Sequence, residues 1–479
     1  MQYDLTSLQP VLPEIFMLGA ACVVLVVDLF LTQRTRMWTY GLTLVALIGA
    51  IALTAWASGP DKQFLFDGSY VRDPVSDVVK IALLTVNLFA MAYARDYLIQ
   101  QDIYRGEFYI LSLFATLGMM VMASANNFLT AYLGLELLAL SLYALVAFDR
   151  DSLKGAEAAM KYFVLGALAS GMLLYGISML YGATGALGFH EVAAAIGSGN
   201  VDETVLVFGL VFVVIGVAFK FGAVPFHMWV PDVYHGAPTA VTLFLGSAPK
   251  IAAFALAIRL LAEGAGPLSS HWSDMLTILA IASLAIGNLV AIAQDNIKRM
   301  LAYSTISHVG FIFLGFIAAD GRGYGAALFY AVVYALTAAG GFGLLTIISR
   351  KGFDAENLHD LKGLNDRSPW LAAMMMLILF SMAGVPPTVG FFAKLFVLEA
   401  VVHVDKVWLA AVAVFFSIIG AYYYLRAVKM MYFDKPIDEE GIQASMDSRL
   451  AISVNGVAIL LLGIFPAGLL QVCRAAFGG

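Results

Sequence analysis

The sequence predicts an all-α polytopic membrane protein with about 14 transmembrane helices. Of its 479 residues, 61% are hydrophobic and only 13% are charged, whereas a soluble chain carries roughly 25% charged residues. The mean hydropathy is +0.87. The apolar residues also gather in runs of about 20, the length that crosses a bilayer as an α-helix. Lipid must therefore be the solvent for much of this chain.

The apolar runs are separated by short polar stretches, which indicates a single membrane domain over residues 1–479. The first run has acidic residues on its flank and no basic n-region, so we interpret it as a spanning helix rather than a cleaved signal peptide. The predicted spans are 11–31, 37–57, 74–95, 108–124, 126–148, 158–182, 204–229, 240–263, 274–294, 300–319, 324–349, 369–403, 407–432 and 450–471.

Two of these runs contain prolines that should interrupt the helix. The twelfth run, 369–403, is too long for one straight crossing and contains the segment Gly384 to Pro387. The seventh contains Pro225, shortly after Gly222. Because proline lacks a backbone donor and clashes with the preceding turn, we expect two half-helices in the twelfth run and a break in the seventh.

The distribution of Lys and Arg predicts the orientation of the helices. We place the loops after helices 1, 3, 5, 9, 11 and 13 in the cytoplasm and both termini on the opposite face. The segment 227–238 has neither Lys nor Arg, and its Pro, Trp and His residues indicate a packed loop. The first side carries Arg34, Arg36, Arg95, Arg105, Arg150, Lys154, Lys298, Arg299, Arg350, Lys351, Lys362, Arg367, Lys435 and Arg449, and the other carries Lys62, Arg72, Arg322, Lys406 and Arg474.

Several kinds of chemistry lack their sequence signatures. The two cysteines, Cys22 and Cys473, lie near opposite ends, without a CxxC or a Cys/His cluster, so iron–sulfur and zinc sites are not expected. No P-loop and no GxGxxG after a strand is present. The net charge of −6 argues against nucleic-acid binding. We therefore expect no cofactor and no metal on this chain.

Four ionisable residues lie deep within the apolar runs: Glu136, Lys220, Lys250 and Lys394. Each would cost roughly 2.5–3.5 kcal/mol at the centre of a spanning helix, on the order of 10 kcal/mol together, if exposed to lipid and unpaired. We therefore expect them inside the bundle, hydrated or paired. The structural alternative is an ion pair between Glu136 and Lys220 that only fixes helix packing, with Lys394 capping free carbonyls at the break.

Other ionisable residues have weaker functional signatures. Lys80 and Arg259 lie near helix ends, and we expect them to extend toward the membrane surface. His227 and His235 flank a proline-rich turn, which favours a structural role. His308 is either a packed histidine or a proton relay. Hydroxyl groups near the four deep residues, those of Ser141, Tyr143, Ser247, Ser304 and Ser307, are candidates for lining a path.

Proton movement suits this set of side chains. Burial disfavours the charged form of a lysine, and a nearby carboxylate restores it. A lysine whose carboxylate neighbour can approach or retreat therefore has a switchable proton affinity. Glu136 and Lys220 would form such a pair, and Lys250 and Lys394 would pass the proton on through water held by the broken helices.

Three segments of the sequence resemble a known family. They are GVAFKFGAVPFHMWVPDVYHGAPTAVT, NIKRMLAYSTISHVGF and GVPPTVGFFAKLF, which are similar to signature stretches of the antiporter-like subunits of NADH:quinone oxidoreductase (respiratory complex I) and of Mrp-type antiporters. The resemblance implies two inverted-topology five-helix repeats, helices 4–8 and 9–13, each with a broken helix. It divides the chain into three N-terminal helices (1–100), a first repeat bundle (108–263), a second repeat bundle (274–432) and a C-terminal helix (450–479).

Within the family, the resemblance is closest to the N subunits. A lysine at position 394 disfavours the M group, and the chain ends soon after the last helix, without the lateral helix of the L group. By resemblance, Glu136 and Lys220 carry over as the switchable pair, Lys250 as the connecting lysine and Lys394 as the terminal one. A D-type subunit of a Mrp cation/proton antiporter remains the alternative, because that group shares these four residue types.

The resemblance also implies partners and a location. NADH, FMN, iron–sulfur clusters and quinone would react on partner subunits, and this chain would be part of the translocase without redox catalysis of its own. Other membrane subunits would pack on both flanks within the lipid bilayer, with protons and water as the transported and conducting species. The three helices before the core favour a bacterial inner membrane, with both termini periplasmic. A third hypothesis is a structural subunit whose charges only hold helices together.

Overall fold

The computed structural model describes residues 5–437, 441–442 and 444–478. Three helices begin the chain, α1 (Leu12–Asp28), α2 (Met37–Ala57) and α3 (Pro74–Gln100), with a short 3-10 helix η1 (Leu5–Val11) before them. A two-stranded antiparallel hairpin, β1 (Gln63–Leu65) and β2 (Tyr70–Arg72), lies between α2 and α3. The hairpin was not predicted from the hydropathy pattern, which does not report on so short an element.

The next five crossings form a first group of helices. They are α4 (Gly106–Ser124), α5 (Phe128–Val146), α6 (Leu153–Thr184), α8 (Glu203–Phe221) with the half-helix α9 (Trp229–Gly236), and α10 (Thr239–Gly246) with α11 (Ala248–Ala257) and the π-helix η2 (Ile258–Gly264). A short helix, α7 (Phe189–Gly197), precedes α8.

Five further crossings form a second group, and the chain then ends with a last pair of helices. The second group is α12 (Ser269–Ile292, after the 3-10 turn η3, Gly266–Leu268), α13 (Ile297–Ile317), α14 (Gly321–Ile348), the pair α16 (Pro369–Ala383) and α17 (Val389–His403), and α18 (Val407–Phe433). Two short elements, η4 (Leu358–Leu361) and α15 (Leu364–Arg367), precede α16. The last pair is α19 (Met446–Ile464) and α20 (Pro466–Ala475).

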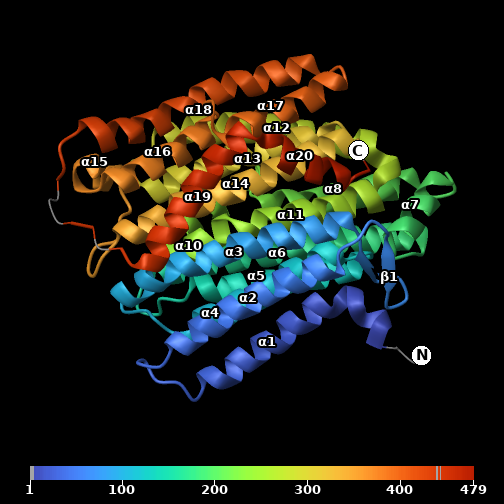
Figure 1. The fold of residues 1–479 in the computed structure, drawn as a ribbon. Helices are drawn as coiled ribbons and strands as arrows, with labels where there is room; N and C mark the ends of the chain where they lie inside the picture. Colours follow the sequence, from blue (N-terminus) through green and yellow to red (C-terminus); the bar gives the residue numbers. More distant parts are fainter. Residues whose placement is uncertain (1–4, 438–440, 443, 479) are drawn as a thin grey trace.

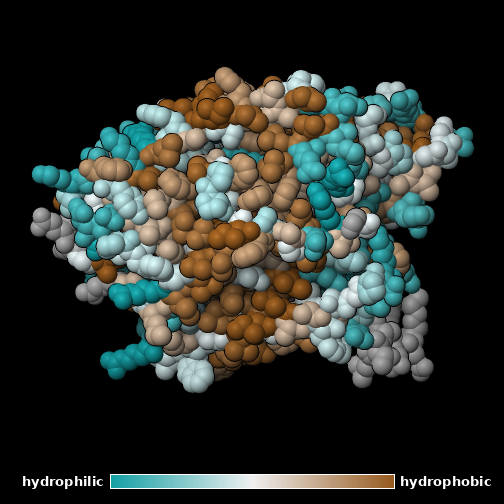
Figure 2. Space-filling model, turned by 45° about the horizontal axis from the view of Figure 1, so that its top comes forward, coloured by the Kyte–Doolittle hydropathy of each residue, from teal (hydrophilic) through white to brown (hydrophobic). Residues whose placement is uncertain are grey.

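The arrangement is that of a membrane-spanning bundle. Thirteen helices of the described chain are long and apolar enough to cross a bilayer. The pair α16–α17, which corresponds to the twelfth predicted run, brings the number of crossings to the predicted fourteen. The start of α1 and the end of α20 lie at the same end of the bundle (Figure 1). A broad hydrophobic belt separates two hydrophilic ends on the visible face (Figure 2). Helices α11, α13 and α14 lie inside and are buried along almost their whole length.

The two predicted helix breaks are confirmed and have the same local structure. Helix α8 ends at Gly222 and α16 at Gly384, with φ values of 81° and 85°. Each glycine donates its N–H back to the last turn, as does the following residue. This left-handed glycine cap satisfies carbonyls that a helix end leaves free. The prolines that follow, Pro225 and Pro387, cannot continue the helix.

One prediction about the seventh crossing was wrong, and the eighth crossing, which spans Thr239–Gly264 as predicted, contains an interruption that was not predicted. The segment 227–238 is not a loop, because residues Trp229–Gly236 form the half-helix α9. Its Pro231 lies in the first turn, where no backbone donor is needed. The eighth run is also interrupted, between α10 and α11 at Ser247. Pro249 in the first turn of α11 cannot donate to the carbonyl of Leu245, so the helix cannot run through unbroken.

Candidate functional site

Glu136 projects from α5, and among the described residues its carboxylate is bonded by a hydroxyl group and forms no direct ion pair. Ser170 of α6 donates a short hydrogen bond to its carboxylate. The same serine hydroxyl lies 3.1 Å from the hydroxyl oxygen of Tyr132, one turn earlier on α5. In this conformation Ser170 orients the carboxylate, because a hydrogen bond to a charged acceptor is stronger than one between neutral groups.

Lys220 lies in the last turn of α8, directly before the break, and shares a cavity with Glu136. The cavity is lined by both residues together with Ser170 and Tyr143. Its volume is about 20 Å³, which is enough for about one water molecule. The predicted pair is thus brought to one space, but within the described residues its charges are joined through that space rather than by a direct ion pair.

Lys250 is fully inside the protein, with 2% of its surface exposed. Its ammonium donates a 2.8 Å hydrogen bond to the carbonyl oxygen of Phe221, the residue after Lys220. The same nitrogen lies 5.4 Å from the ring centroid of Trp229. A helix end presents free carbonyls with partial negative charge, so the break in the seventh crossing supplies the counter-dipole that lets a charged lysine be buried here.

Hydroxyl groups lead from the α10–α11 break into the second group of helices. The Tyr334 hydroxyl donates to the carbonyl of Gly246 over 3.2 Å and lies 2.7 Å from the hydroxyl of Thr305 on α13. His308 lies one turn further along α13. These contacts connect the surroundings of Lys250 with those of His308.

His308 is bonded at both ring nitrogens. Its Nδ1 lies 2.7 Å from the hydroxyl of Tyr330, and its Nε2 lies 3.0 Å from the hydroxyl of Tyr424. Tyr424 also makes a short hydrogen bond with Ser304. In a neutral imidazole one nitrogen donates and the other accepts. The ring therefore imposes one direction on this series of hydrogen bonds, and exchange of its tautomer reverses that direction.

Lys394 lies on α17 and points back to the break in the twelfth crossing. Its ammonium donates to the carbonyl of Ala383, the last residue of α16, over 2.8 Å, and to Ser417 over 2.9 Å. It lies 5.1 Å from the ring centroid of Phe311, one turn beyond His308. Lys250 and Lys394 thus make the same kind of contact, in which the ammonium group donates to a backbone carbonyl at the C-terminal end of a half-helix.

Some residues at this site were not singled out from the sequence. Ser170, Tyr132, Tyr330, Tyr334 and Tyr424 supply most of the hydroxyl groups. Their signal in the sequence is weak: Tyr330 and Tyr334 are one turn apart in an apolar helix, where a buried phenol needs a partner. Of the hydroxyl candidates that were singled out, Tyr143 and Ser304 join the site, whereas Ser141, Ser247 and Ser307 bond elsewhere.

Lys80 and Arg259 do not extend to the membrane surface as predicted. Each is 1% exposed. Lys80 forms a 2.5 Å ion pair with Glu14, and Arg259 binds both oxygens of Asp73 at 2.8 Å. Because acidic partners on α1 and before α3 reach these positions, pairing inside the protein replaces exposure at the interface. Both pairs attach the first three helices to the rest of the bundle or to one another.

The two other histidines that the sequence singled out, His227 and His235, lie near the half-helix α9. His227 precedes α9 within the break, and His235 lies in its last turn, 3.8 Å from Glu356. Within the described residues, no three His, Cys, Asp or Glu side chains come together as metal ligands would.

Comparisons with known proteins place these features in a family context. The family described as NADH:quinone oxidoreductase/Mrp antiporter, TM matches residues 125–420. The chain is 58% identical to NADH-quinone oxidoreductase subunit N of Thioalkalivibrio sulfidiphilus over 477 residues, which cover 99% of each chain.

Solved structures give the same result for the fold. A chain of respiratory complex I from Thermus thermophilus with bound aureothin has a TM-score of 0.82 and 31% identity, covering 96% of this chain and 98% of that chain. A chain of the Mrp complex from Dietzia sp. DQ12-45-1b has a TM-score of 0.87 and 22% identity, covering 99% and 97%. At that identity the second likeness bears on the fold alone.

Proposed function

The chain belongs to the NADH:quinone oxidoreductase/Mrp antiporter membrane family, and on that premise we propose that it is the proton-translocating subunit N of a bacterial NADH:quinone oxidoreductase. In this proposal NADH, FMN, the iron–sulfur clusters and quinone react on partner subunits. The chain is part of the translocase and carries no redox step itself. Its partners are the other membrane subunits, which pack on both flanks.

The observation that supports this function most directly is the series of buried polar groups that lie between Glu136 and Lys394. The Glu136 carboxylate and Lys220 line one cavity, and Lys250 binds the residue after Lys220. The Tyr334 hydroxyl contacts the carbonyl of Gly246, four residues before Lys250, and the hydroxyl of Thr305, one turn before His308. A second cavity of about 10 Å³, lined by His308 and residues of α16 and α17, lies on the way to Lys394.

Each lysine can act as a proton carrier because the groups around a buried lysine decide whether its charged form is stable. When the Glu136 carboxylate approaches, the ammonium form of Lys220 is favoured, and when it retreats, the buried charge is penalised. The proton then leaves Lys220 through water and is taken up by the neutral amine of Lys250. His308 accepts a proton on one ring nitrogen and releases one from the other, so the proton moves on toward Lys394 while the charge of the imidazole is unchanged and its tautomer is exchanged. The tautomer must return before the next transfer.

The orientation of the chain follows from the Lys and Arg distribution in its loops. The face rich in these residues is cytoplasmic and both termini are periplasmic, in the inner membrane of a bacterium. Protons would therefore be taken from the cytoplasm and released at the outer face.

Replacement of Lys220 by Ala in the assembled complex tests the proposal. We expect proton pumping and NADH:quinone turnover to fall, while NADH oxidation by an artificial acceptor, which bypasses the membrane subunits, stays unchanged. The matched control is Lys429→Ala, since Lys429 is exposed on α18. Full pumping by a correctly assembled Lys220→Ala complex would exclude the proposed role of this lysine.

A subunit of a Mrp-type cation/proton antiporter is the second candidate, because the Dietzia Mrp chain shares the fold over 99% of this chain. Co-purification separates the two. Flavin and iron–sulfur subunits accompany an oxidoreductase subunit, whereas only small membrane subunits accompany a Mrp subunit. The 58% identity to a subunit N favours the oxidoreductase.

A further inference from the structure

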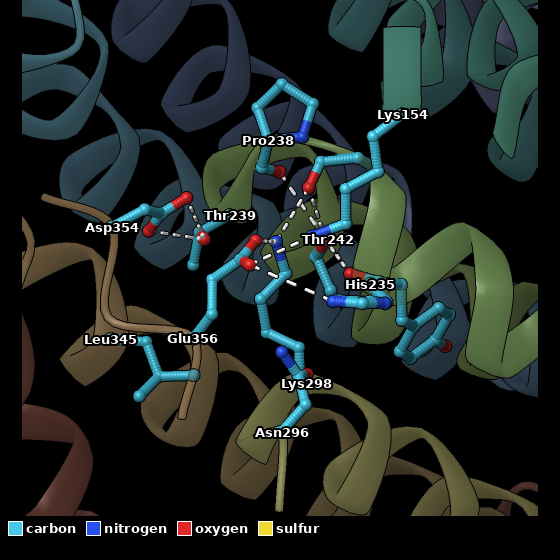
Figure 3. Close-up of polar contacts among 12 residues, drawn as sticks. Lys154, His235, Pro238, Thr239, Thr242, Asn296, Lys298, Leu345, Asp354 and Glu356 are labelled. Atoms are coloured by element: carbon cyan, nitrogen blue, oxygen red, sulfur yellow. Dashed lines mark hydrogen bonds and ion pairs between the residues drawn. The ribbon is translucent and has the colours of Figure 1, made fainter. Parts of the chain in front are cut away.

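The junction between α9 and α10 is held by residues from outside the first group of helices. Lys298 of α13 donates a 2.8 Å hydrogen bond to the carbonyl of Ala237. The hydroxyl of Tyr97, on α3, accepts from the backbone N–H of Thr239 at 3.0 Å. The Thr239 hydroxyl donates to Asp354, in the segment after α14, at 3.0 and 3.1 Å. Figure 3 shows Thr239, Lys298 and Asp354 converging on this junction.

Glu356 completes this arrangement by neutralising Lys298. Its carboxylate lies 3.2 Å from the Lys298 ammonium and 2.9 Å from that of Lys154 on α6 (Figure 3). Burial opposes ionisation of Glu356, but the charges of Lys298 and Lys154 outweigh it and lower the pKa of the carboxyl group. The backbone of Glu356 also accepts from the N–H of Ile297 at 2.7 Å, which fixes it against the start of α13.

Asp354 is a second anchor, and in the part of the chain that the structure describes its oxygens accept from hydroxyl groups. Besides Thr239, it accepts from Tyr97 at 2.8 Å and from Ser349 at 2.9 Å. Three hydrogen bonds to one carboxylate fix its position firmly, because each is charge-assisted. We call Tyr97, Lys298, Asp354 and Glu356 together the junction cluster.

The side of α9 is held by the same turn of α13. Asp232, in the first turn of α9, binds Arg299 at 2.7 Å and Lys161 of α6 at 2.9 Å. Lys298 and Arg299 are neighbours in the chain. One turn of α13 therefore contacts both the side of α9 and the carbonyl that follows it, so α9 is constrained against rotation and against translation.

The other end of α9 reaches the lysines. Its first residue, Trp229, donates its indole N–H to the carbonyl of Phe219 at 3.0 Å and places its ring beside the ammonium of Lys250. The helix has eight residues and is therefore about 12 Å long. A displacement of the junction cluster is thus transmitted by a short rigid helix to the Lys220–Lys250 region.

We propose that the junction cluster is a set of positioning residues through which α3, α13 and the segment after α14 fix half-helix α9, and thereby set the contact of Lys250 with the carbonyl end of α8. The inference rests on the proposed proton translocation. It adds that the second group of helices controls the geometry of proton transfer in the first.

The test compares variants of the assembled complex. Glu356→Gln leaves the Lys298 charge without its partner, and Thr239→Val removes the hydroxyl that binds Asp354, whereas Thr239→Ser keeps it. The matched control is Asp360→Asn, because the Asp360 carboxylate bonds the Asn357 backbone and not the junction. The measurements are protons pumped per NADH and hydrogen exchange of the amides in residues 229–250.

We expect Glu356→Gln and Thr239→Val to raise amide exchange in residues 229–250 by about tenfold, because each variant loses one hydrogen bond to a charged group. We also expect both variants to lower the number of protons pumped per NADH. Thr239→Ser and Asp360→Asn should match the wild type in both measurements. NADH oxidation by an artificial acceptor reports the redox subunits alone and should stay constant, and co-purification of this chain with those subunits reports assembly.

Two results would overturn the inference. One is faster exchange spread evenly over all helices, which indicates general destabilisation. The other is unchanged pumping in both variants despite faster exchange in residues 229–250. Lys220→Ala is measured in parallel, so that the two proposals fail separately. Normal pumping by Lys220→Ala would exclude proton transfer through Lys220. Loss of pumping in Lys220→Ala together with normal pumping in Glu356→Gln would exclude only the role of the junction cluster.

Discussion

Lys250 donates a 2.8 Å hydrogen bond to the carbonyl oxygen of Phe221, the last residue of α8. This contact joins the central lysine to the break that follows Lys220, and it uses a carbonyl that an uninterrupted helix would have paired within itself. The charge of one lysine is thus stabilised by the backbone next to the other.

Replacement of Lys250 by Met should abolish proton passage without disturbing assembly. Met has a similar shape and no titratable group, so packing around α11 is retained. We expect pumping to fall by about tenfold or more, because a positioned proton-transfer group commonly contributes at least that much. The control is Lys429→Met on the exposed side of α18. If Lys250→Met pumped normally and only its thermal stability changed, Lys250 would be structural.

Ser170→Ala should remove the hydrogen bond that Ser170 donates to the Glu136 carboxylate. The infrared stretching band of a carboxylate depends on the hydrogen bonds that it accepts, so we expect the band of Glu136 to move. Infrared difference spectroscopy of the assembled complex measures this change. Ser178→Ala, on the same helix, is the control, since Ser178 bonds the backbone of its own helix. An unshifted band in Ser170→Ala would contradict the prediction.

The deep charges and both helix breaks could be predicted because each is a local signal. A lysine within about 20 apolar residues is visible in a short stretch of sequence, and so is a glycine with a proline two or three positions later. The structure then confirmed half-helices at Gly222 and Gly384. The family assignment was also accessible, because the three quoted segments are long and specific.

The partners of these residues could not be predicted, because each contact joins distant helices. Nothing around Ser170 indicates that it faces Glu136, 34 positions earlier. Lys80 was misplaced for the same reason, since its counter-charge is Glu14 on another helix. The hydropathy of α9 is interrupted by Asp232 and His235, so a half-helix there had the pattern of a loop. Which side chains of two helices face each other depends on how the helices pack, and a short stretch of one sequence does not show it.

Tyr424→Phe should interrupt the hydrogen bonds through His308. The phenol bonds the Nε2 atom of His308 at 3.0 Å and also Ser304, so its removal leaves the imidazole with a partner on one side only. We expect lower pumping with unchanged oxidation of NADH by an artificial acceptor. Tyr422→Phe is a close control, because Tyr422 is 59% exposed on the same helix. Equal pumping by the two variants would exclude Tyr424 from proton transfer.

Asp73→Asn should destabilise the attachment of the N-terminal helices rather than proton transfer. Asp73 is 1% exposed and binds Arg259 through both oxygens at 2.8 Å, and removal of one partner from a buried pair commonly costs about 3–5 kcal/mol. The measurement is the temperature at which this chain leaves the soluble fraction of the purified complex. Asp67→Asn, in the exposed turn of the hairpin, is the control.

The same ion pair predicts how stability depends on pH. Burial would raise the pKa of Asp73, but Arg259 outweighs it and lowers the pKa from 3.8 to about 2. A carboxyl group with a lowered folded-state pKa contributes stability that is fully present above its unfolded value and is lost as the pH falls through the folded one. The wild-type complex should therefore lose stability from about pH 3.8 towards pH 2 more steeply than Asp73→Asn. Parallel curves for the two proteins would mean that Asp73 is not ionised against Arg259 in the folded chain.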